Sequence, residues 1–113
     1  IPVIFGDMTL LKKTALNLSA SICLEKASTP DAAIMKNNKG INIVSISSFS
    51  PGDITPGRVS MITGKAAGRY IESAITAAQH GNIDAVVTCP IHKKAFHEGG
   101  YLYPGHTEMF ADK

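Results

Sequence analysis

The chain has 113 residues, of which 44% are hydrophobic and 18% charged, and its net charge at pH 7 is +2. This length gives room for one domain with one modest core. So small a net charge gives no reason to expect binding to nucleic acid or to an anionic membrane, and no apolar run approaches the roughly 20 residues of a membrane span.

Several features predict a cytoplasmic piece of a longer protein. No basic-then-apolar leader is visible, and Cys23 and Cys89 lie far apart without C-x-x-C spacing. This pattern predicts two reduced, partly buried thiols in a cytoplasmic protein. The chain begins on an apolar run without Met and stops at Lys113, soon after a predicted helix begins. We therefore expect both ends to continue in a longer protein.

The chain opens with the pattern of a strand followed by a helix. Residues 2–5 (PVIF) form a continuous apolar run, which is typical of a strand covered on both faces. Asp7 is placed to cap a helix over residues 8–18, whose apolar positions fall on one face. A carboxylate at the end of a strand is also able to face a ligand, so Asp7 has two possible roles.

Two further strands and a short helix are predicted in the next part of the chain. Residues 21–26 (SICLEK) alternate like an edge strand, and Pro30 suits the first turn of a short helix. Residues 37–40 (NNKG) are typical of a turn, and the β-branched run 41–46 (INIVSI) predicts a strand. Residues 47–56, with two prolines, predict a loop that either connects two elements or borders a site.

The longest predicted helix begins after Ser60, a suitable N-cap, and continues to about His80. Its apolar positions recur at helical spacing, and Gly81 is placed to end it. Gly64 and Gly68 are spaced for close backbone packing, either on the sheet or on another subunit. They do not form a phosphate loop, because no strand leads directly into them and no Lys-Ser/Thr pair follows.

Residues 84–88 (DAVVT) predict a buried parallel strand, which Cys89 and Pro90 end sharply. Strands that alternate with helices predict the α/β class, in a three-layer α/β/α arrangement with a mainly parallel sheet. Polar groups that follow such a strand lie where open α/β sheets bind ligands. We therefore expect the functional site in residues 84–113.

The first candidate group in this stretch is the pair Lys93 and Lys94. Residues 91–96 predict a short helix or turn, whose first turn presents free N–H groups to an anion. Either lysine is able to supply a cation to a phosphate or a carboxylate. The alternative is a pair of lysines on a solvated face.

The second candidate group is the run Gly105-His106-Thr107-Glu108. Gly105 permits an unusual backbone angle, and Thr107 is suited to cap a new helix. His106 is then expected at the positive end of that helix, aimed outward, where it and the Thr107 hydroxyl suit a polar, anionic small molecule. The alternative is a helix cap with no further role.

The residues themselves indicate no metal site and no nucleophile. His92, His97 and His106 lack the i, i+4 pairing of a helical metal site, and no cysteine joins them. No Ser-His-acid arrangement or nucleophile elbow is visible. We assign no metal ligand within this chain.

The segment VVTCPIHKKAFHEGGYLYPGHTEMFA resembles the 4-hydroxythreonine-4-phosphate dehydrogenase family of vitamin B6 biosynthesis. The family combines V-T-x-P after a strand, an Asn- or His-Lys pair, a Gly turn and G-H-T-E. The matching residues here are Val87-Thr88-Cys89-Pro90, His92-Lys93, Gly99-Gly100 and Gly105-His106-Thr107-Glu108. The helix TGKAAGRYIESAITAA and the opening PVIFGD are also similar to the family's, so the resemblance covers nearly the whole chain.

The resemblance implies a fold related to isocitrate and isopropylmalate dehydrogenases, with two α/β/α domains, a cleft between them and a homodimeric assembly. Residues 1–113 would be a single α/β segment of this larger two-domain enzyme. The implied reaction oxidises 4-phosphooxy-L-threonine with NAD or NADP. The product then loses carbon dioxide to give 3-amino-2-oxopropyl phosphate. A divalent metal (zinc, magnesium or cobalt) suits this chemistry.

The resemblance also implies roles for particular residues. His106 and Thr107 match the family's substrate contacts, and Lys93 matches a position near the cleft where a catalytic role is expected. The family's Gly-rich opening would precede Ile1. Its three metal-binding histidines, most phosphate contacts and the nucleotide pocket would follow Lys113. We therefore expect the isolated chain to be inactive, and formation of NADH by it would contradict this.

Three alternatives remain. The first is a sister enzyme that acts on another 4-phosphorylated four-carbon acid, such as a phosphothreonate or phosphoerythronate. The second is a non-catalytic α/β module that binds a phosphorylated small molecule or a partner. The third, a flavodoxin-like regulatory domain, has less support, because Gly6 and Asp7 alone do not make an acidic pocket or a flavin phosphate loop.

Overall fold

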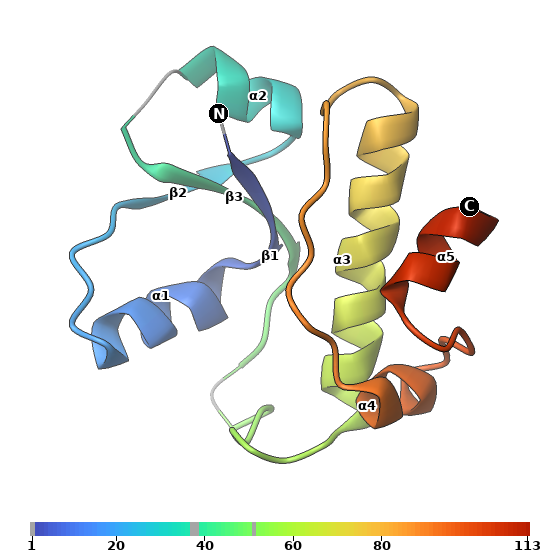
Figure 1. Ribbon diagram of the computed structural model, residues 1–113. Helices are drawn as coiled ribbons and strands as arrows, with labels where there is room; N and C mark the ends of the chain where they lie inside the picture. Colours follow the sequence, from blue (N-terminus) through green and yellow to red (C-terminus); the bar gives the residue numbers. More distant parts are fainter. Residues whose placement is uncertain (1, 37–38, 51) are drawn as a thin grey trace. The chain divides into compact units, whose positions relative to one another are not determined.

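The chain folds into two compact units, residues 1–51 and residues 52–113. The structure is a computed structural model that describes residues 2–36, 39–50 and 52–113. The first unit carries a sheet and two helices, and the second is built from helices (Figure 1). Part of the predicted turn at residues 37–40 lies outside the described residues.

A parallel sheet forms the centre of the first unit. In its described part this sheet has three strands, in the order β1 (Val3–Asp7), β3 (Ile41–Ser47) and β2 (Leu24–Ala27). β3 pairs in parallel with both neighbours, and Ile43 is completely buried because this strand is central. The sheet confirms the predicted α/β class and the parallel pairing. It also confirms the predicted edge strand, which begins at Leu24 instead of Ser21.

Asp7 joins β1 to the helix that follows it. Helix α1 (Met8–Asn17) begins directly after Asp7, and α2 (Pro30–Lys36) begins at the predicted proline. The Asp7 carboxylate accepts hydrogen bonds from the Leu10 N–H at 2.8 Å, the Ser47 hydroxyl at 2.9 Å and the Phe49 N–H at 2.8 Å. Asp7 is only 2% exposed. The predicted cap is therefore confirmed, and the carboxylate serves the fold.

The second unit is organised around its longest helix. Helix α3 (Met61–Gln79) lies beside α4 (Lys93–Glu98) and α5 (His106–Asp112) (Figure 1). Ser60 caps α3 as predicted, since its side chain accepts a hydrogen bond from the Thr63 N–H at 3.2 Å. Gly81 follows the helix with φ +72°, a conformation that favours glycine. The core of this unit contains Ile71, Ile75, Phe96 and Met109.

The glycines of α3 allow this close helix packing. A Cβ on Gly64 would overlap the carbonyl of Ala95 in α4, and a Cβ on Gly68 would overlap the ring of Tyr101. Tyr101 stacks on Phe96, with ring centroids 5.0 Å apart. The prediction of close packing is confirmed. Within this unit the glycines contact α4 and Tyr101, neither of which was named among the expected partners.

The predicted strand over residues 84–88 is wrong. The described residues carry no strand there, and Val87 is 96% exposed. A strand requires hydrogen bonds to a neighbouring strand, and the apolar run by itself does not supply that neighbour. The sequence thus shows the tendency of these residues to form a strand but not the pairing.

Two further expectations concern the surface. Cys23 and Cys89 are free thiols, but both are exposed instead of partly buried as predicted. Among the described residues, none of the helices combines the length and the apolar character that crossing a membrane requires.

Candidate functional site

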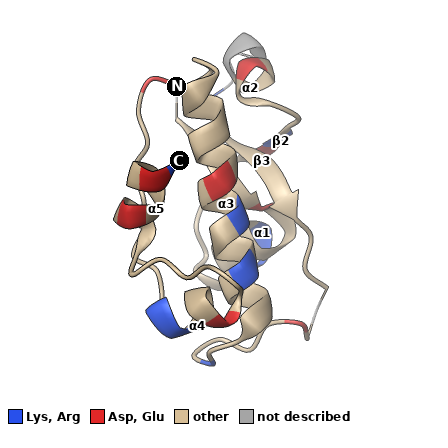
Figure 2. Cartoon of the chain, turned by 90° about the vertical axis from the view of Figure 1, so that its right-hand side faces the viewer, with Lys and Arg blue, Asp and Glu red and all other residues tan. Residues whose placement is uncertain are grey.

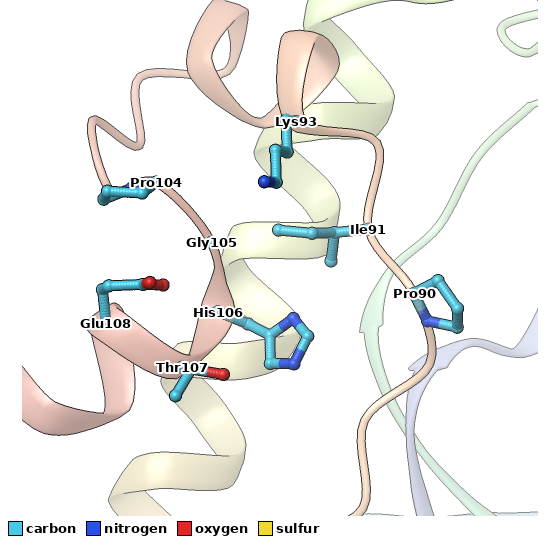
Figure 3. Close-up of a pocket in the computed structure, with 8 residues that line it drawn as sticks. All are labelled: Pro90, Ile91, Lys93, Pro104, Gly105, His106, Thr107 and Glu108. Carbon is cyan, nitrogen blue, oxygen red and sulfur yellow. The ribbon is translucent and has the colours of Figure 1, made fainter.

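A surface pocket of about 330 Å³ lies in the second unit. One side is formed by the segment that enters α4, and the other by the first residues of α5 and the two residues before them (Figure 3). The pocket is lined by Pro90, Ile91, Lys93, Pro104, Gly105, His106, Thr107 and Glu108. Lys93, His106 and Thr107, the three residues to which the family resemblance gives roles, are among them.

Opposite charges border this pocket. Lys93 extends from the first turn of α4, and Glu108 from the first turn of α5 (Figure 3). Figure 2 shows the same pattern on the elements, with basic residues at the start of α4 and acidic residues on α5. Within the described part of the chain, the Lys93 ammonium makes no hydrogen bond or ion pair. Its charge is therefore available to a ligand. Lys94 does not line the pocket.

His106 is the most constrained polar residue of the pocket. Its Nε2 atom lies 2.9 Å from the Thr88 hydroxyl oxygen, which ties α5 to the segment before α4. Its Nδ1 atom is buried and has no hydrogen-bond partner among the described residues. An unpaired buried polar atom costs about 1–3 kcal/mol, so Nδ1 is a natural contact for a ligand. The ring is thus half-buried and bonded, and the expectation that it points outward was wrong.

The start of α5 differs from the predicted cap. Gly105 is the N-cap, and no side chain forms a capping hydrogen bond. Thr107 occupies the second helical position instead of the cap and exposes its hydroxyl beside the pocket. Gly105 has φ −170°, an extended conformation open to any residue, so no unusual angle is needed there. The capping explanation for Thr107 was therefore wrong, and its hydroxyl remains available to a ligand.

The two other histidines of this stretch serve local structure. His92 caps α4, since its Nδ1 accepts a hydrogen bond from the Ala95 N–H at 3.3 Å. His97 Nε2 lies 2.7 Å from the Tyr103 carbonyl oxygen. Among the described residues, no group of three or more His, Cys, Asp or Glu side chains is arranged to hold a metal ion.

Two tyrosines anchor the segment that leads from α4 to the pocket. Tyr101 donates a hydrogen bond to Glu72 of α3 at 2.9 Å, and Tyr103 donates one to Asp112 of α5 at 2.6 Å. Burial, with a smaller contribution from Glu72, raises the pKa of Tyr101 to about 12. The hydrogen bond to Asp112 raises the pKa of Tyr103 above its usual value. Both phenols therefore stay protonated at neutral pH and hold this segment through hydrogen bonds.

Sequence reasoning missed part of the site. It placed Thr88 at the end of a strand but did not pair it with His106, and it gave Glu108 no role in a pocket. Ile91 and Pro104 were not considered as lining residues. The V-T-x-P and P-G-H-T-E patterns were the available signal, since they flank the two sides of the pocket.

The fold agrees with that of a solved dehydrogenase. The crystal structure of a 4-hydroxythreonine-4-phosphate dehydrogenase from Burkholderia phymatum matches with a TM-score of 0.88 and 35% identity, over 98% of this chain and 33% of that chain. A D-threonate 4-phosphate dehydrogenase of Cupriavidus necator is 33% identical over 110 residues, which are 97% of this chain and 32% of that protein. These matches place the chain among α/β proteins, and the relatives it matches are named dehydrogenases.

A third relative narrows this class to a family. The 4-hydroxythreonine-4-phosphate dehydrogenase of Trichlorobacter lovleyi is 32% identical over 111 residues, which are 98% of this chain and 33% of that protein. The model of the family described as pyridoxal phosphate biosynthetic protein PdxA matches residues 1–113, and the chain belongs to this family. The chain spans about a third of the length of the curated relatives that it matches.

Proposed function

We propose that the full protein oxidises the secondary alcohol of 4-phosphooxy-L-threonine with NAD or NADP. The product then loses carbon dioxide and gives 3-amino-2-oxopropyl phosphate for pyridoxal phosphate biosynthesis. In this proposal the residues that line the pocket of the second unit form one side of the substrate site. Support comes from the family to which the chain belongs and from the names of its relatives.

The observation that carries the proposal is the convergence of Lys93, His106 and Thr107 on one pocket. The substrate has a phosphate, a carboxylate and a secondary hydroxyl. These groups suit an ammonium cation, a side-chain hydroxyl and an imidazole nitrogen. The volume of about 330 Å³ is at the lower end of small-molecule sites, as a four-carbon phosphorylated acid requires.

The proposed roles of these residues are binding and orientation. Lys93 neutralises an anionic group of the substrate, while Thr107 and His106 form hydrogen bonds that place the reacting carbon. Holding the substrate in one orientation lowers the entropic part of the activation barrier for hydride transfer to the nucleotide. Ile91 and the two prolines supply apolar contacts that exclude water from one side.

NAD or NADP and a divalent metal belong to the proposed activity of the full protein. The described residues do not fit a metal ion, because no group of three potential ligands is assembled among them. We therefore assign no step to a metal held by this chain. The metal, whether zinc, magnesium or cobalt, and the nucleotide are proposed to bind outside these residues.

A second candidate substrate is D-threonate 4-phosphate. The relative from Cupriavidus necator carries this substrate in its name, and it is as similar to the chain as the relatives named for 4-hydroxythreonine 4-phosphate. At the second carbon the two substrates differ in bearing a hydroxyl or an ammonium group. Side-by-side kcat/KM values for both acids with the full gene product would decide between them.

We also propose that the full protein is a cytoplasmic homodimer, as the resemblance to its family implies. Light scattering after size-exclusion chromatography would test the assembly, and a mass of one protomer would contradict it. Fractionation of the source cells would test the location.

Replacement of Thr107 tests the proposed site directly. Thr107→Val removes the hydroxyl and keeps the shape of the side chain, so we expect kcat/KM for 4-phosphooxy-L-threonine to fall by about tenfold or more. Thr76→Val is the matched control, because Thr76 is exposed on α3 and does not line the pocket. Equal kcat/KM values for the two variants would contradict the placement of substrate in this pocket.

A further inference from the structure

The hydrogen bond between Thr88 and His106 has two possible directions, and the direction determines which nitrogen of His106 carries a hydrogen. The Thr88 hydroxyl oxygen and His106 Nε2 are 2.9 Å apart, and either group is able to donate. A neutral imidazole carries one N–H hydrogen, so the direction of this bond decides whether Nδ1 is a donor or an acceptor.

The surroundings favour donation by Thr88. Within the described residues, His106 Nε2 is the hydrogen-bond partner found for the Thr88 side chain, so donation to Nε2 satisfies the hydroxyl hydrogen. The opposite direction leaves that hydrogen without a protein acceptor and also leaves the Nδ1 lone pair buried and unpaired. Donation by Thr88 leaves a single unsatisfied group, the Nδ1–H, which is the group that an anionic ligand oxygen would accept from.

We propose that Thr88 is a positioning residue that holds His106 in its Nδ1–H tautomer, so that Nδ1 donates a hydrogen bond to an anionic oxygen of the phosphorylated substrate. The identity of the ligand rests on the proposed function, whereas the tautomer does not. Thr88 acts through the imidazole and is not itself a lining residue of the pocket.

Access to Nδ1 requires a small local movement. The atom is buried, and Ile91 lines the same pocket as His106 (Figure 3). A tilt of the ring about its contact with Thr88 would expose Nδ1 to the pocket.

The tautomer is measurable without any ligand. Long-range ¹H–¹⁵N correlation spectra of the full gene product, recorded with the imidazole neutral, separate an N–H nitrogen from a bare ring nitrogen. The His106 signals are assigned by their loss in His106→Gln. We expect Nδ1 to carry the hydrogen in the wild type and in Thr88→Ser, and the Nε2–H form to rise in Thr88→Val.

A kinetic measurement tests the consequence for binding. We expect Thr88→Val to raise KM for 4-phosphooxy-L-threonine by about tenfold, and Thr88→Ser to restore most of the loss. Thr14→Val is the matched control, because it makes the same chemical change on the exposed surface of α1 in the first unit. We expect its KM to equal that of the wild type.

The outcomes separate this proposal from the proposed function. A dominant Nε2–H tautomer in the wild type would overturn it, as would a Thr88→Val variant with unchanged tautomer and KM. If Thr88→Val does not fold, the wild-type and Thr88→Ser spectra still decide the tautomer. An Nδ1–H tautomer without turnover of either phosphorylated acid would support the role of Thr88 and contradict the proposed function.

Discussion

The histidines and lysines of the second unit differ in role, since some stabilise the local backbone and others line the pocket. His92 and His97 make hydrogen bonds that serve the local backbone, whereas His106 keeps one buried nitrogen unpaired. Lys93 likewise faces the pocket while its neighbour Lys94 does not line it. His106 Nδ1 and the Lys93 ammonium, which have no partner among the described residues, therefore both belong to residues that line the pocket.

The neighbouring lysines give a prediction at this scale. Lys93→Ala removes the pocket cation, so we expect KM for a phosphorylated substrate to rise by about tenfold or more, because charge-assisted hydrogen bonds are among the strongest. Lys94→Ala removes the same charge outside the pocket, and we expect its KM to change by less than about twofold. Steady-state kinetics of both variants in the full gene product would measure this. A larger effect from Lys94 than from Lys93 would refute the assignment.

At the scale of elements, the packing of α3 on α4 depends on glycine. Helix propensity favours alanine over glycine by about 1 kcal/mol, but a Cβ on Gly64 would overlap the Ala95 carbonyl. We expect Gly64→Ala to lower the free energy of unfolding by roughly 1–3 kcal/mol, as overpacked cores do.

Urea unfolding of the full gene product would measure this loss. Lys65→Ala is the control, since Lys65 is the exposed neighbour on the same helix, and we expect it to change stability by less than about 0.5 kcal/mol. A Gly64→Ala variant as stable as the wild type would show that α3 and α4 are not in contact as described.

Tyr101 gives a second prediction for this packing. The phenol loses its proton at pH about 10 in the unfolded chain and at about 12 in the folded one. Its contribution to stability is therefore full below pH 10 and is lost as the pH rises from 10 to 12, because the unfolded state then binds fewer protons. Tyr101→Phe removes this group.

The measurement is the slope of unfolding free energy against pH above pH 10, where we expect a steeper decline in the wild type than in Tyr101→Phe. An ultraviolet titration of phenolate would give the pKa itself. Identical slopes, together with a Tyr101 pKa near 10, would contradict the environment described for this side chain.

Elements with local signals were predictable from the sequence. The caps at Asp7 and Ser60 and the terminating Gly81 use residue types whose chemistry acts within a few positions, and all three were confirmed. The strand expected at residues 84–88 failed because pairing depends on a distant neighbour. For the same reason the G-x-x-x-G spacing predicted close packing but not the identity of its partners.

In the site, too, features with a local sequence signal were predictable and contacts between distant residues were not. The residue types of Lys93, His106 and Thr107 marked them as candidates, and the pocket does bring them together. The Thr88–His106 contact joins residues 18 positions apart, so no local pattern was able to reveal it. The supposed cap at Thr107 failed because a capping residue and a residue two positions inside the helix look alike in sequence.

At the scale of the whole molecule, the chain supplies a pocket, but its described residues bring together no group of three potential metal ligands. It spans about a third of the length of its curated relatives. We therefore expect the 113 residues alone to give no reduced nucleotide with substrate, metal and NAD supplied. Activity of these residues alone would contradict this division of the site.

The absorbance of reduced nucleotide, followed with the full gene product, a divalent metal and NAD or NADP, tests the proposed function. We expect reduction of the nucleotide with 4-phosphooxy-L-threonine and release of carbon dioxide, and no reduction with the unphosphorylated acid. D-Threonate 4-phosphate is assayed in parallel. A folded protein that reduces neither nucleotide with either phosphorylated acid would contradict the proposed dehydrogenase activity.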